Sequence, residues 1–155
     1  MILKSFEIKK INQNINHLIL FYGKNEGFKN EAIDILNKDK LNILSYEEKE
    51  IFDNENNFIE NILSKSLFEK QKFIVIKRAT DKILKIIEIL QQKNLDDTII
   101  ILNSDNLEKK SKLRSIFEKD KKLVCVPFYP DNDQTLSKLA YNFLSNKKIS
   151  LSPSN

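Results

Sequence analysis

Four short and almost wholly apolar runs limit this chain to a small set of folds. Each is four or five residues long, and charged or polar segments separate them, as expected of strands buried on both faces. They are Leu18–Tyr22, Phe73–Ile76, Ile99–Leu102 and Leu123–Val126. A weaker run, Tyr46–Phe52, is interrupted by charges, which is typical of an edge strand.

Segments of helical period lie between these runs. Apolar side chains fall on one face in Phe28–Leu36, Phe58–Leu63 and Ile83–Leu90, and more briefly in Leu113–Phe117. Strands that alternate with helices of about ten residues predict βα units. We therefore expect an α/β fold of three layers, αβα, around a mainly parallel five-stranded sheet. A short leading helix is expected within Phe6–Ile15.

The pattern changes after Val126. Two prolines and the helix-capping residues 131–133 precede a new apolar helix face, Leu136–Leu144. We predict an α/β domain over residues 1–128 and the first part of a helical domain over 129–155. Because the last residues look like another helix start, we expect this second domain to be truncated.

Composition excludes several classes of protein. The 155 residues carry a net charge of +4, which is compatible with contact to nucleic acid but lacks the dense basic stripe that would argue for it. A single cysteine rules out an internal disulfide framework and suits a reducing compartment. With no signal-peptide pattern and no apolar run of membrane-spanning length, we expect a cytoplasmic protein without a membrane partner.

The residues after the first strand stand where a nucleotide-binding α/β protein has its phosphate loop. A working loop reads G-x-x-x-x-G-K-[ST]; its backbone N–H groups and lysine hold phosphate, and its hydroxyl holds Mg²⁺. Counted from Gly23, the second glycine position is Phe28, the lysine position is Lys29 and the hydroxyl position is Asn30. Gly27 comes one residue early. Only the lysine of these three diagnostic residues is present.

The acidic residue that would complete a magnesium site is also missing from its expected place. The third strong strand should carry it, but that strand runs through Leu102 into Asn103 and Ser104, with Asp105 further along in a loop. The loop is either a degenerate relative of an ATPase scaffold or a plain turn that its glycines permit. ATP hydrolysis and a bound cofactor are not expected in either case, because hydrolysis needs both metal-holding groups.

Other catalytic chemistry has little support. His17 is the only histidine, and Cys125 lies within an apolar strand, which indicates core packing. Without a second histidine or cysteine, neither a zinc site nor a Cys–His nucleophile can be assembled. We expect no catalytic residue and no metal.

Basic residues crowd one segment of the chain. This segment could line a path for nucleic acid, but interspersed acidic residues favour a solvated helix face. The candidate DNA contacts are Lys109, Lys110, Lys112 and Arg114.

An apolar pair, Leu67–Phe68, stands in an otherwise polar connection between the helix Phe58–Leu63 and the strand Phe73–Ile76. Such a pair at a helix end often packs into the core or staples the helix. The alternative is an exposed pair that inserts into a pocket of a partner protein, where two such residues can dominate an interface.

The ordered set of segments resembles the δ subunit of bacterial DNA polymerase III, a clamp-loader subunit. The resemblance covers essentially the whole chain, and its most specific part is Ser66-Leu67-Phe68 followed by a strand. The matching stretches are Ile2–Ser5, Leu20–Gly23 with Glu26-Gly27, Ser66–Phe68, Phe73–Ile76, Thr98–Leu102, Leu107–Arg114 and Val124–Val126.

This resemblance implies a RecA/AAA+-like domain that does not bind ATP productively at Gly23, Gly27 and Lys29. It implies that Leu67 and Phe68, with Ser66, plug a pocket on the β sliding clamp, so that the ring opens for loading on DNA. The γ/τ subunits would hydrolyse ATP, and δ′ would complete the loader. This chain would contact DNA weakly or through the complex. The chain would thus be a non-catalytic subunit of the DNA-directed DNA polymerase holoenzyme, here without the family's collar domain.

The resemblance therefore favours the exposed, partner-binding interpretation of the apolar pair. The other functions left open are a divergent P-loop ATPase or nucleotide kinase, and a small DNA-binding module that uses the basic segment.

Overall fold

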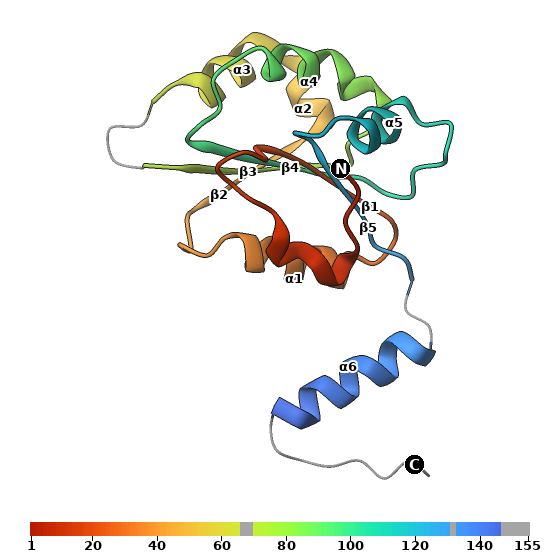
Figure 1. The fold of residues 1–155 in the computed structure, drawn as a ribbon. Helices are drawn as coiled ribbons and strands as arrows, with labels where there is room; N and C mark the ends of the chain where they lie inside the picture. The colour runs from red at the N-terminus through yellow and green to blue at the C-terminus, as the bar shows by residue number, and fades with distance from the viewer. Residues whose placement is uncertain (66–69, 131–132, 147–155) are drawn as a thin grey trace.

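The computed structural model describes residues 1–65, 70–130 and 133–146. Five strands form one sheet in the order β2-β3-β4-β1-β5, and every pairing in it is parallel (Figure 1). The three-layer α/β fold is therefore confirmed, with a sheet that is parallel throughout. The strands are β1 Leu18–Tyr22, β2 Ile43–Glu47, β3 Lys72–Lys77, β4 Thr98–Asn103 and β5 Val124–Pro127.

Helices cover both faces of the sheet. Figure 1 shows α2, α3, α4 and α5 over one face and α1, with the N-terminal segment, over the other. Within the described residues the helical elements are η1 Ser5–Lys10, α1 Glu26–Leu36, α2 Glu48–Asp53, α3 Glu55–Leu63, η2 Asp81–Ile83, α4 Leu84–Gln91, α5 Lys112–Lys119 and α6 Asp133–Asn146.

Strand β1 lies inside the sheet, between β4 and β5, and its two faces explain why its run is continuously apolar. Alternate side chains point to opposite faces of a strand. Leu18, Leu20 and Tyr22 belong to the core beneath α2–α5, whereas Ile19 and Phe21 belong to the core beneath α1. All five are almost fully buried because a helical layer covers each face.

The predicted edge strand is at the edge of the sheet, but its bounds were wrong. It spans Ile43–Glu47, and residues 48–53 form α2. A capping box begins this helix, in which the backbone N–H of Glu47 donates to the carboxylate of Glu50 at 2.9 Å. The charges that appeared to interrupt a strand are thus helix-start residues.

The predicted leading helix is shorter than Phe6–Ile15 and is a 3₁₀ helix that ends at Lys10. Asparagine side chains beyond it bond to nearby backbone and compete with a continued helix. The Asn16 side chain accepts the N–H of Asn12 at 3.2 Å and donates to the carbonyl of Lys122 at 3.0 Å.

Helix α6 lies apart from the three layers in Figure 1. Its Leu136, Tyr141 and Phe143 side chains are exposed. The division into domains at residues 128 and 129 remains a prediction. No helix of the described residues is both long and apolar enough to cross a membrane.

Candidate functional site

The loop between β1 and α1 packs against the residue that follows β5. Gly23 has φ +117°, where L side chains are strained, and a Cβ atom there would lie 2.0 Å from the carbonyl oxygen of Phe128. The Gly23 N–H donates to the carbonyl of Asp105 at 3.2 Å, and Phe128 donates to the carbonyl of Tyr22 at 2.7 Å. Gly23 therefore permits a close approach of backbone to backbone, and its N–H is already bonded within the chain.

Only Lys24 and Asn25 separate Gly23 from the start of α1. The Asn25 side chain caps the helix by accepting the N–H of Phe28 at 3.2 Å. Gly27 lies in the first turn, where an added Cβ would meet only the Asn25 Oδ1 atom, at 3.8 Å. The loop is thus short and ends in a side-chain cap, and the space around Gly27 would accept a Cβ atom.

Lys29 has a fully buried side chain. Its ammonium donates to the backbone carbonyl of Ser104 at 2.9 Å and forms an ion pair with Glu26, one turn earlier in α1. The carbonyl belongs to the residue just after β4, so the lysine ties the start of α1 to the end of the neighbouring strand. The ammonium group has protein partners where a phosphate-binding lysine would face a ligand.

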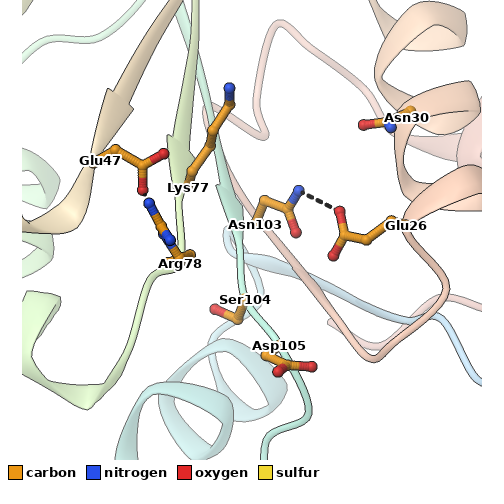
Figure 2. A pocket seen from close by; sticks show the side chains of 8 residues that line it. All are labelled: Glu26, Asn30, Glu47, Lys77, Arg78, Asn103, Ser104 and Asp105. Atoms are coloured by element: carbon orange, nitrogen blue, oxygen red, sulfur yellow. Dashed lines mark hydrogen bonds and ion pairs between the residues drawn. The ribbon is translucent and has the colours of Figure 1, made fainter.

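A cavity of about 400 Å³ opens at the carboxyl ends of β2, β3 and β4 (Figure 2). Arg78 bonds to Glu47 at 2.8 Å, and the side-chain amide of Asn103 bonds to Glu26 at 3.4 Å. The lining carries both carboxylates and cations. Its lining residues are Glu26, Asn30, Glu47, Lys77, Arg78, Asn103, Ser104 and Asp105.

The strand we expected to carry the acidic magnesium ligand is β4, the fourth strand in the chain. The third is its neighbour β3, which ends at Lys77 and is followed by Arg78. Neither strand ends in a carboxylate, and Asp105 lies in the loop after β4 as predicted. Among the described residues, no group of three or more His, Cys, Asp or Glu side chains is placed to hold a metal ion.

The predicted clamp-binding residues Ser66, Leu67 and Phe68 lie outside the described residues. The structure does describe both ends from which that segment extends. Helix α3 ends at Leu63 with Phe58 and Ile62 buried in the core, and β3 begins at Lys72.

Nothing in the sequence marks Lys72, whose ammonium contacts several oxygens at the end of α3. It donates to the carbonyls of Asn61 at 2.5 Å, of Ile62 at 3.3 Å and of Ser64, and to the Ser64 hydroxyl at 3.1 Å. These partners are eight to eleven residues away in sequence. No local pattern could have marked this contact.

The candidate DNA contacts are in two different environments. Lys109, Lys110 and Lys112 are exposed, and Lys110 pairs with Glu108 at 2.9 Å. Arg114 is only 17% exposed in its side chain and bonds to Glu118 at 2.7 Å. Its guanidinium also lies 5.0 Å from the centre of the Tyr22 ring, so Arg114 has a packing role that the three lysines lack.

The lone histidine and cysteine also have places in the fold. The His17 ring nitrogen Nδ1 lies 3.2 Å from the carbonyl oxygen of Thr98, at the opposite end of the sheet from the cavity. Burial, together with the charge of Glu118, raises the pKa of the Cys125 thiol to about 12. The thiol is therefore protonated at neutral pH and is part of the core, not a nucleophile.

Comparison of sequences identifies no relative: no family model matches the chain, and no curated protein matches it. Comparison of structures finds a similar fold. The fold resembles that of a clamp-loader δ protein. The Bacillus subtilis DNA clamp loader delta protein (YqeN) superposes with a TM-score of 0.65 at 13% sequence identity. The match covers 92% of this chain and 46% of that protein, so the chain spans about half the length of its structural neighbour.

Proposed function

We propose that this chain acts as the amino-terminal part of a clamp-loader δ subunit. It would bind the β sliding clamp and open the ring for loading on DNA during replication. The observation that carries the proposal is the match of fold to a clamp loader delta protein over 92% of the chain. A shared fold is compatible with many functions, so the proposal also depends on the loop and on the apolar pair.

The geometry of the β1–α1 loop supports a subunit that does not hydrolyse ATP. Phosphate binding needs backbone N–H groups and a lysine that face the ligand. Here the Gly23 N–H and the Lys29 ammonium bond to Asp105 and Ser104. ATP chemistry would then belong to other subunits of the loader, the γ/τ subunits, with δ′ completing the assembly.

Leu67 and Phe68 are the proposed anchors for the clamp. Burying each side chain in a pocket would contribute about 1.5–3 kcal/mol, so that two adjacent anchors can dominate an interface. A protein that uses no ATP can open a ring only by binding the open form more tightly than the closed form. Leu67 and Phe68 would supply that difference in affinity between the open and the closed ring.

Binding to a purified β sliding clamp tests the proposal. We expect wild-type chain to bind and Leu67→Ala/Phe68→Ala to lose at least ten-fold in affinity, with an unchanged circular dichroism spectrum and melting temperature. Leu136→Ala/Phe143→Ala removes the same residue types from exposed positions of α6 and should bind normally. Equal binding by the Leu67/Phe68 variant, or equal loss in the control, would refute the proposed anchors.

The ATPase alternative is tested with the same protein. A ligand that binds only the folded state raises the melting temperature as its concentration exceeds its dissociation constant. We expect the melting temperature in millimolar Mg²⁺-ATP to equal the melting temperature in Mg²⁺ with inorganic phosphate. Magnesium-dependent hydrolysis above the buffer rate would contradict our interpretation of the loop.

A further inference from the structure

The two edges of the sheet differ in how they are covered. At the β5 edge the first residues of the chain close the sheet: Ile2 forms a parallel bridge with Cys125. The Leu3 N–H donates to the Cys125 carbonyl at 2.9 Å, and the Cys125 N–H donates to the Met1 carbonyl at 2.8 Å. At the opposite edge, β2 pairs only with β3 among the described residues (Figure 1). An uncovered edge presents backbone groups to which another strand can bond.

The direction of the backbone groups of β2 follows from the neighbouring strand. In a parallel ladder the N–H and C=O of one residue point to the same side, and the side alternates along the strand. The Lys72 N–H donates to the carbonyl of Asp97 at 2.8 Å, on the side of β4, so the groups of the next residue, Phe73, point toward β2. Phe73 is in register with Ile43. Of two residues in parallel register only one turns its groups toward the other, so those of Ile43 point away from the sheet.

Alternation gives the same outward direction to Ser45 and Glu47. The N–H of Glu47 agrees with this assignment, because it donates to the carboxylate of Glu50, outside the sheet, at 2.9 Å. The N–H and C=O groups of Ile43 and Ser45 have no partner within the part of the chain that the structure describes. Strand β2 thus presents two free donors and two free acceptors at its outer edge.

The side chains of β2 do not protect this edge. Natural edge strands are commonly shielded by a lysine, a proline or a bulge. The segment Ile43–Tyr46 has neither residue, and its register with β3 is uninterrupted. Ser45 is exposed, and Ile43, Leu44 and Tyr46 are only half-buried. The edge is therefore suited to pairing with a further strand.

We propose that β2 pairs with β2 of a second copy of this chain, antiparallel and about a two-fold axis, with Leu44 opposite Leu44 of the second copy. The inference goes beyond the proposed function and does not depend on it. In this register Ile43 of each copy lies opposite Ser45 of the other, and each such pair exchanges two hydrogen bonds. All four free groups of each copy are then bonded, and the half-buried Leu44 side chains meet at the axis.

The charges that flank β2 favour this arrangement. Two lysines and one aspartate precede the strand at residues 38–40, and three glutamates and one lysine follow its centre at residues 47–50. Lys38, Lys40 and Glu50 are exposed. Antiparallel pairing brings the basic start of each strand toward the acidic end of the other, whereas parallel pairing would place like charges together. A second copy supplies this complementary pattern by symmetry, because the same surface serves both partners.

Sedimentation velocity over about 5–500 μM protein provides the first test. Only two short strands pair directly, so we expect a weak dimer that forms at the upper concentrations. Ser45→Pro deletes an outward N–H that the fold does not use, in a strand where an edge proline is tolerated, and should weaken the dimer about ten-fold or more. Ser45→Ala keeps the N–H and should dimerise like wild type. If Ser45→Pro does not fold, Ser45→Lys replaces it, since a lysine at the edge opposes pairing.

Disulfide cross-linking tests the register. Residues opposite each other in a non-hydrogen-bonded antiparallel pair have Cα atoms about 4.5 Å apart, within reach of a disulfide. Leu44→Cys should therefore give a cross-linked dimer under oxidation by copper phenanthroline. The two Ser45 residues of the dimer would be roughly 8 Å apart, too far for a disulfide, so Ser45→Cys should not cross-link. Ser45 is the more exposed position, so random collision would favour the opposite order. Cys125 is buried and common to both variants.

Each other result contradicts the proposal. A wild-type chain that stays monomeric at every concentration would overturn it and would leave the open edge to an extended segment of a different protein. A dimer that Ser45→Pro and Ser45→Lys do not weaken would form through another surface. Cross-linking of Ser45→Cys as fast as that of Leu44→Cys would show that the two strands do not meet in the proposed register.

Discussion

The ammonium group of Lys29 donates a hydrogen bond to the backbone carbonyl oxygen of Ser104 at 2.9 Å, from a side chain with no solvent exposure. Its second partner, Glu26, is 61% exposed in its side chain. Lys29 and Glu26 therefore differ in what each loses when their ion pair is broken. A buried cation cannot turn to water, whereas an exposed carboxylate can.

This difference predicts an order of stabilities. Glu26→Ala leaves the Lys29 ammonium buried with one carbonyl, and should lower the free energy of unfolding by about 3 kcal/mol. Lys29→Met removes the buried charge and leaves only the Ser104 carbonyl without a donor, at a cost of about 1–2 kcal/mol. Urea denaturation of both variants measures the order. A larger loss for Lys29→Met than for Glu26→Ala would contradict this account of the pair.

Gly23, in the β1–α1 loop, and Gly27, in the first turn of α1, should respond oppositely to alanine. At Gly23 the positive φ and the 2.0 Å approach to the Phe128 carbonyl both exclude a Cβ atom, so Gly23→Ala should cost about 3 kcal/mol or more. Gly27 lies in a helix with room around it. Gly27→Ala should therefore stabilise the protein by about 0.5–1 kcal/mol. Thermal melting distinguishes the two signs, and destabilisation by Gly27→Ala would show that this glycine has another role.

The hydroxyl oxygen of Ser104 is buried and has no hydrogen-bond partner within the described part of the chain. A buried polar group without a partner lowers stability, so Ser104→Ala should raise the free energy of unfolding by about 1 kcal/mol. Ser111→Ala is the contrasting variant. That hydroxyl donates to Asp81 at 2.6 Å and caps α5 by accepting the N–H of Arg114 at 3.2 Å, so its loss should cost about 1 kcal/mol. If the denaturation midpoints of Ser104→Ala and Ser111→Ala moved in the same direction, the predicted difference between the two hydroxyl groups would be wrong.

The lowered pKa of the Asp81 carboxyl group predicts how the stability of the folded state changes in acid. Partial burial opposes ionisation of its carboxyl group, but hydrogen bonds from the Ser111 hydroxyl and from the N–H groups of Leu113 and Lys112 outweigh it and lower the pKa. A carboxyl group with a lowered pKa stabilises the folded state above its unfolded pKa, and this stabilisation is lost as the pH falls through the folded pKa.

The difference in stability between wild type and Asp81→Asn should accordingly be present at pH 7 and disappear as the pH falls below about 4. Its size at pH 7 should be below about 1 kcal/mol, because the group is largely exposed to solvent. Melting temperatures of wild type and Asp81→Asn between pH 3 and pH 7 measure this difference. A difference for Asp81→Asn that stays constant over this range would contradict the assignment.

The strands and layers of this protein could be predicted from the sequence because they depend on local periodicity. The run Leu18–Tyr22 is apolar at every position, and only a strand with a helical layer on each side buries all of them. The stripe Ile83–Leu90 likewise predicted a helix, which the structure divides into η2 and α4. The same reasoning failed at Glu47 and Glu48, where charges mark the start of a helix and were taken for interruptions of a strand.

Contacts between distant residues were decided only by the tertiary structure. The sequence identified Lys29 by its place in a loop, but not that its ammonium would bond to Ser104, 75 residues away. Lys72 had no distinguishing pattern, since its partners at the end of α3 are reached only once the sheet and its helical layer are packed. Periodicity determines which face of an element is buried. Which polar groups then meet depends on strand order, which places the end of β4 beside β1 and the start of β3 beneath α3.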